Sequence, residues 1–192
     1  MEAFLISVGV VALAEVGDKT QLLALVLAAR YRRPLPIIAG IVVATLANHA
    51  IAGAIGAMAL RALGPTALRG VLALSFFGMA VWTLIPDTLD PAETERPPRF
   101  GVFGTTAVTF FLAEIGDKTQ VATMALAARY ASVGWVVAGT TTGLLLADVP
   151  AVLLGERLAG RLPTRTVHVI AALAFVVLGV LVLLPSGAKL LE

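Results

Sequence analysis

The nine residues LAEVGDKTQ at positions 13–21 reappear as LAEIGDKTQ at positions 112–120, at an offset of 99 residues. The same offset aligns AARY at positions 28–31 with AARY at positions 127–130, and no gap is needed between these matches. The chain of 192 residues is therefore an internal duplication. Each copy of the motif places two acids and one lysine inside a long apolar stretch, and this combination decides the fold class.

The composition is that of a membrane protein. Apolar residues make up 59% of the chain and charged residues only 14%, whereas soluble domains carry about 25% charged residues. The mean hydropathy is +0.96. These values exclude a soluble fold, a disordered chain and a nucleic-acid-binding protein. The net charge of +2 is small and fits basic loops between spans. The absence of cysteine excludes disulfides, thiolate metal sites and cysteine nucleophiles.

Six apolar stretches are each long enough to cross a hydrocarbon core of about 30 Å. They run approximately over residues 3–29, 36–60, 66–85, 101–128, 131–155 and 166–184. The first stretch lacks a basic leading region and is interrupted by Glu15 and Asp18, so we expect a retained span and not a signal peptide. The predicted fold is an all-α integral membrane protein with six transmembrane helices.

The predicted organisation is two three-helix repeats joined by a linker. Repeat 1 covers residues 1–85, a polar proline-rich linker covers residues 86–100, and repeat 2 covers residues 101–192. Because three is an odd number of spans, the second repeat enters the membrane from the opposite face. With the N-terminus outside, eight basic residues lie in the cytoplasmic loops and four in the outer segments, so both termini are predicted outside. Inverted repeats are typical of secondary transporters, whose site lies at the midplane.

Four carboxylates are the predicted metal ligands. Glu15 and Glu114 lie near the centres of their stretches, where a charged group is costly, and Asp18 and Asp117 follow them. An all-oxygen set suits a hard divalent cation such as Ca²⁺, Mn²⁺ or Mg²⁺. When the site is empty the carboxylates repel one another and some should hold protons. Release of these protons on cation binding would couple the two fluxes, as an antiporter requires.

The spacing within the motif predicts which neighbours support these acids. On a continuous helix Glu15 and Asp18 share a face, Lys19 lies one turn beyond Glu15, Gln21 joins that face and Thr20 points to the side. The central glycine of each motif allows close backbone approach or a break that frees carbonyl ligands. The alternative is a purely structural pair of staples joining each glutamate to the lysine four residues later. The expected supporting residues are Lys19, Thr20, Gln21, Lys118, Thr119 and Gln120.

Polar residues in the second and fifth stretches form a second group. Asn48 and His49 lie at the middle of one stretch, and Asp148 is the repeat counterpart of His49 in the other. Asp148 and His49 are candidates for proton coupling. The alternatives are a hydrogen bond between helices for His49, and for Asp148 either a pair with His49 or a neutral carboxyl. We also expect Pro150 to kink its helix.

Three other functions stay open at this point. A divalent-cation channel or uniporter could use the same acids, although channels usually build an acidic ring from oligomer symmetry. An intramembrane hydrolase could share a proton between two acids, but the sequence contains no nucleophile elbow and no HExxH motif. A small assembly subunit without transport would leave the central acids unexplained.

The doubled Glu-x-Gly-Asp-Lys-Thr motif, each copy on the first span of a three-span repeat, resembles the transmembrane protein 165 family, formerly uncharacterised protein family 0016. The resemblance covers essentially the whole chain. It implies an exporter of Mn²⁺ or Ca²⁺ in exchange for H⁺, with the metal as substrate and no permanent cofactor. It also implies a cation site at Glu15, Asp18, Glu114 and Asp117, with Lys19, Thr20, Lys118 and Thr119 completing the motif.

The resemblance also predicts where the protein acts. The chain has no long N-terminal extension and no seventh span, so we expect a compact member in the bacterial inner membrane. Its expected partners are the metal ion, protons and the lipid bilayer, and no nucleic acid. The sequence specifies neither an oligomeric state nor a preference between Mn²⁺ and Ca²⁺.

Overall fold

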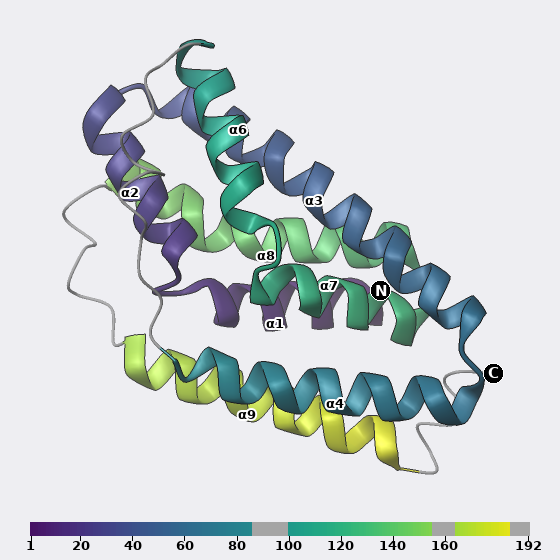
Figure 1. Ribbon diagram of the computed structural model, residues 1–192. Helices are drawn as coiled ribbons and strands as arrows, with labels where there is room; N and C mark the ends of the chain where they lie inside the picture. Colours follow the sequence, from purple (N-terminus) through teal and green to yellow (C-terminus); the bar gives the residue numbers. More distant parts are fainter. Residues whose placement is uncertain (86–99, 155–163, 185–192) are drawn as a thin grey trace.

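The computed structural model describes residues 1–85, 100–154 and 164–184, and these residues form helices and turns without a strand. The prediction of an all-α protein is confirmed for them. The predicted linker at 86–100 lies almost wholly outside the described residues. The helices in Figure 1 are α1 (Glu2–Glu15), α2 (Lys19–Tyr31), α3 (Pro34–Ala62), α4 (Pro65–Thr83), α6 (Gly101–Glu114), α7 (Lys118–Tyr130), α8 (Val133–Leu154) and α9 (Thr164–Leu183).

Four of these helices, α3, α4, α8 and α9, are long and apolar enough to cross a membrane by length and composition. The other two predicted spans each consist of two shorter helices, α1 with α2 and α6 with α7. The break that the central glycine allows therefore occurs in each motif, and the face that Glu15 and Asp18 would share on a continuous helix is not formed. The six-span count and the inversion of the repeats stay predictions.

Each motif breaks its helix at the same place for the same reason. Gly17 has φ +82° and Gly116 has φ +77°, a left-handed conformation that costs other residues about 1–2 kcal/mol. The preceding residue is extended, and the aspartate after each glycine occupies the N-cap of the next helix. The Asp18 carboxylate accepts a long hydrogen bond of 3.5 Å from the Thr20 N–H. The glutamate and aspartate of one motif thus lie on two different helices.

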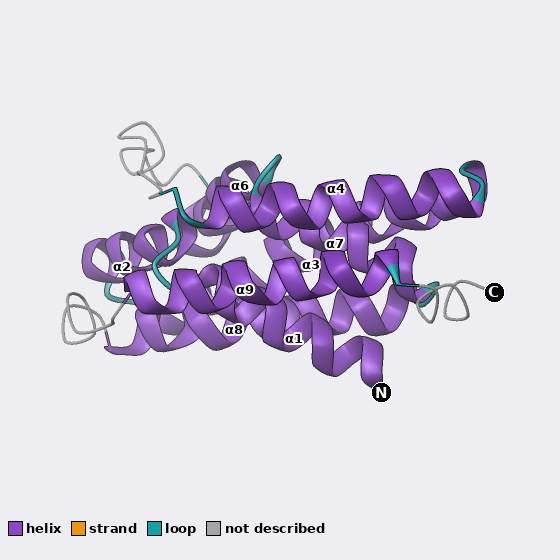
Figure 2. Cartoon of the chain, turned by 90° about the horizontal axis from the view of Figure 1, so that it is seen from below, coloured by secondary structure: helices purple, strands orange, loops and turns teal. Residues whose placement is uncertain are grey.

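The packing repeats itself with the two halves exchanged. α1 packs along α8, and α6 packs along α3. Both contacts depend on glycines at matching positions: a Cβ on Gly139 would lie 2.6 Å from the Phe4 carbonyl oxygen, and one on Gly40 would lie 2.9 Å from the Phe103 carbonyl oxygen. The small residues let two helix backbones approach closely. The last helices of the two halves, α4 and α9, pack against each other as a pair along one side of the molecule (Figures 1 and 2).

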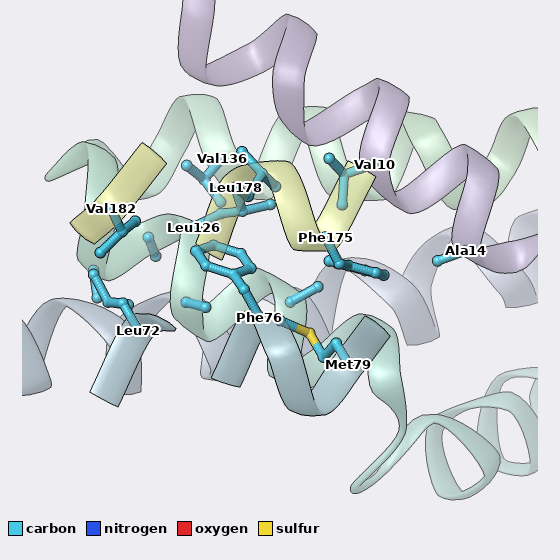
Figure 3. Close-up of a cluster of buried hydrophobic side chains, with 14 of the residues drawn as sticks. Val10, Ala14, Leu72, Phe76, Met79, Leu126, Val136, Phe175, Leu178 and Val182 are labelled. Carbon is cyan, nitrogen blue, oxygen red and sulfur yellow. The ribbon is translucent and has the colours of Figure 1, made fainter. Parts of the chain in front are cut away.

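The α4–α9 pair has one buried and one exposed face. Phe76 and Phe175, which are repeat counterparts, are fully buried together in the cluster of Figure 3. Two positions earlier in each helix, Leu74 and Leu173 are 75% and 59% exposed. Large leucines facing outward at matching positions are costly in water but favourable against lipid chains. The pair therefore packs inward on the motif helices and presents an apolar outer surface.

Candidate functional site

Two ion pairs connect the motifs of the two halves. The Lys118 ammonium pairs with the Asp18 carboxylate, and both side chains are fully buried. The Lys19 Nζ lies 3.5 Å from Asp117 Oδ1, and the Lys19 side chain is 22% exposed. Each lysine thus neutralises an aspartate of the other repeat. This crossed arrangement differs from the staple within one motif that the sequence left open, and it brings the two breaks into one region.

The motif threonines bind the glutamates. The Thr20 hydroxyl contacts a Glu15 carboxylate oxygen and lies 3.3 Å from Asp18 Oδ2. In the second motif the Thr119 hydroxyl donates to Glu114 Oε2 at 3.0 Å. The expectation that Thr20 points to the side is wrong. The break turns the first residues of α2 back toward the end of α1, so the hydroxyl reaches across it.

The motif glutamines stabilise the broken backbone. Gln21 Oε1 accepts from the Gly17 N–H at 2.9 Å, and Gln120 Oε1 accepts from the Gly116 N–H at 2.8 Å. The Gln21 amide also donates to the Ala147 carbonyl of α8 at 3.1 Å. Gln21 was expected on the face of Asp18, but its bonds go to backbone groups: the Gly17 N–H at the break and the Ala147 carbonyl of α8. In this conformation Gln21 therefore connects the first break to α8.

The two glutamates keep binding capacity that the protein does not use. Glu15 Oε2 and Glu114 Oε1 are buried and have no hydrogen-bond partner among the described residues. The two carboxyl groups are close enough for their charges to interact. Within the described ranges, however, no three acidic, histidine or cysteine side chains are close enough to share one metal ion. The four predicted ligands are thus gathered around the crossed ion pairs without forming a closed coordination shell.

The polar residues of α3 and α8 take separate partners. His49 Nδ1 lies 3.3 Å from the Thr141 hydroxyl, and the Asn48 amide donates to the Phe111 carbonyl at 2.9 Å. Asp148 is fully buried, and neither of its carboxylate oxygens has a hydrogen-bond partner among the described residues. A pair between His49 and Asp148 is therefore not formed. An orphaned buried carboxyl is costly unless it holds a proton or meets a cation.

One residue near the site was missed from the sequence. His168 of α9 donates from Nε2 to the Val16 carbonyl at 2.8 Å, inside the break of the first motif. The available signal was the duplication, since the offset of 99 pairs His168 with Arg69 near the start of the last helix of each half. Neither residue stands out on composition alone, because both lie close to the predicted span ends.

Comparison with known proteins identifies the chain. Residues 3–91 and 102–189 match the family model described as "Divalent cation/proton antiporter GDT1". The chain belongs to this family. The resemblance to the transmembrane protein 165 family is thereby confirmed, and the protein belongs to a transporter family and is not an enzyme. The hydrolase alternative is set aside. GDT1 membership and the apolar helices together make it a multi-pass membrane protein.

Individual relatives of the GDT1 family cover nearly the whole chain. A Vibrio cholerae protein named "Putative manganese exporter" is 50% identical over 179 residues, covering 93% of this chain and 88% of the relative. A GDT1-like protein of Synechocystis is 29% identical and covers 91% and 93% of the two chains. GDT1-like protein 5 of Arabidopsis thaliana is 27% identical, with 94% of each chain covered. No solved structure matches the chain.

Proposed function

We propose that this GDT1 protein exports Mn²⁺ in exchange for protons, holding the cation between the two motif breaks. The observation that carries the proposal is the pair of crossed ion pairs, which join two intramembrane acidic motifs from opposite ends of the chain. The similarity to the V. cholerae protein favours manganese. Ca²⁺ is the second candidate substrate, because carboxylate oxygens bind both ions.

The proposed ligands are Glu15, Asp18, Glu114 and Asp117. The unpartnered oxygens of the two glutamates support this set, since a divalent cation would satisfy them. Four carboxylates and the two motif lysines carry a net charge of −2 when all are ionised. One divalent cation or two protons would neutralise that charge, so we propose exchange of two protons for each cation. The supporting residues hold the ligands: Thr20 and Thr119 contact the glutamates, Gln21 and Gln120 the breaks, and Lys19 and Lys118 the aspartates.

We propose that Asp148 and its repeat counterpart His49 take part in proton coupling. Asp148 is buried without a partner and close enough to Glu114 for their charges to interact. A group in that position can take a proton when the cation leaves and return it when the next cation binds. His49 lies on the facing helix and has an unpartnered Nε2 among the described residues.

The proposed transport cycle is alternating access by two inverted repeats, residues 1–85 and 101–192. The exchange of equivalent contacts, α1 on α8 and α6 on α3, supports a two-fold relation between the halves. Broken helices that meet near the midplane are typical of secondary transporters. We place the protein in a bacterial inner membrane with both termini outside, on the basis of the loop charges.

The test is metal-driven proton flux in liposomes that contain the purified protein. We expect Mn²⁺ to drive proton movement more strongly than Ca²⁺ or Mg²⁺, and Glu15→Gln and Asp117→Asn to abolish it. Glu2→Gln, which changes an exposed acid on the same helix as Glu15, is the matched control and should transport normally. Cation entry without proton movement would contradict exchange and indicate a channel or uniporter. Silence for all three metals in folded protein would contradict the proposed site.

A further inference from the structure

The two halves do not make equivalent contacts with the α4–α9 pair. α9 packs on α1, the first half of one broken helix, whereas α4 packs on α7, the second half of the other. If both halves had the same environment, α9 on α1 would be matched by α4 on α6. In this conformation the α4–α9 pair is therefore placed asymmetrically with respect to the two motifs.

The motif breaks differ in exposure in the same sense. Ile115, in the break of the second motif, is 53% exposed, while its counterpart Val16 is half-buried. The packing of α9 on α1 and the exposure of Ile115 thus agree that the first break is covered and that the second is more exposed.

His168 provides a polar link across the covered side. Its imidazole N–H donates to the Val16 carbonyl at 2.8 Å, and this carbonyl belongs to the non-helical segment of the first motif. The counterpart Arg69 has a buried Nε without a hydrogen-bond partner among the described residues. The tether is therefore present in one half and lacks an equivalent bond from Arg69 Nε in the other.

We propose that His168 is a positioning residue that holds α9 against the first motif break and so stabilises the conformation in which the second break is accessible. Release of this hydrogen bond is a step of transport, because the α4–α9 pair must leave the first break before a cation can reach it from the other side. This inference rests on the proposed alternating access. It adds a residue outside both motifs to the machinery that sets which side is open.

The test measures accessibility directly and uses the absence of cysteine from the chain. Single-cysteine reporters, Val16→Cys and Ile115→Cys, are labelled with a polar maleimide in nanodiscs, where both faces are open to the reagent. In each background the ratio of the Val16→Cys to the Ile115→Cys labelling rate reports the balance of the two conformations. Labelling requires no transport, so failure of this inference and failure of the liposome flux are separate results.

Loss of the tether should raise the ratio about fivefold in His168→Leu, the shift expected when one ordinary hydrogen bond is lost. His168→Asn, which is too short to reach the carbonyl, should give the same result and serves if the leucine variant does not fold. His168→Gln retains an N–H donor of similar reach and should stay near the wild-type ratio. Arg69→Leu, the matched change in the other half, should not raise it. An unchanged ratio in His168→Asn, or an equal rise in Arg69→Leu, would overturn the proposal.

Discussion

The buried ion pair between Lys118 and Asp18 gives the sharpest energetic prediction. Both side chains are fully buried, whereas Lys19 of the second pair is 22% exposed and lies 3.5 Å from Asp117. Removing one partner of a buried pair leaves an uncompensated charge and costs about 3–5 kcal/mol. In the second pair Asp117 is only 2% exposed, but Lys19 is in partial contact with solvent, so its loss costs less, about 1–3 kcal/mol.

Lys118→Met should therefore destabilise the protein by about 3 kcal/mol or more, and Lys19→Met by less, about 1–3 kcal/mol. The free energy of unfolding is measured by chemical denaturation in micelles, with the midpoint and slope fitted separately. The double variant Lys118→Met with Asp18→Asn is the decisive control. Because it removes both charges, it should recover most of the lost stability. Equal losses in the two lysine variants, or no recovery in the double variant, would refute the asymmetry of the crossed pairs.

Three further predictions concern the breaks and the ligands. Gly116→Ala should lower the free energy of unfolding by about 1–2 kcal/mol because φ is +77° there. The control Gly9→Ala, in the middle of α1 with open space around it, should be neutral or stabilising. Unfolding titrations that rank the two variants the other way would contradict the left-handed break. Thr119→Val removes the hydroxyl that donates to Glu114 Oε2 and should raise the half-saturating Mn²⁺ concentration about 10-fold or more. The control is Thr142→Val, which removes a hydroxyl that bonds a carbonyl of its own helix, and it should leave that concentration unchanged. Equal effects of the two variants on flux would show that Thr119 does not act through the ligand. Asp148→Asn should slow metal-driven proton movement, and the fold-decrease in flux should be at least as large as the fold-decrease in Mn²⁺ affinity. Flux and Mn²⁺ binding are measured on the same purified protein. Normal flux would show that Asp148 takes no part in proton coupling.

The duplication, the membrane class and the acids of the motif could be predicted because each is a property of the linear sequence. Hydropathy and charge depend only on which residues follow one another, and the offset of 99 residues is visible by direct comparison of the halves. The same information predicted that Glu15 and Glu114 lie inside apolar segments. The family comparison then confirmed the kind of transporter that these residues indicate.

The state of the motif backbone could not be decided in this way. Glycine is compatible with a helix and with the left-handed conformation, so the sequence allowed both a continuous helix and a break at Gly17. The broken conformation is stabilised by tertiary hydrogen bonds: Gln21 donates to the Ala147 carbonyl of α8, and His168 donates to the Val16 carbonyl. Thr20 changes its expected direction for the same reason.

The partners of the charged residues were equally beyond the sequence. Lys118 lies four residues from Glu114 in the chain, yet its ion pair is with Asp18, one hundred residues away. Which carboxylate a lysine reaches depends on how the two halves pack, and that packing depends on close approaches such as Phe4 against Gly139. The sequence by itself determined which residues carry the charge and that they lie within apolar segments. Only the tertiary structure decided which of them face one another, because contacts between distant segments follow from the packing of whole helices and not from local preference.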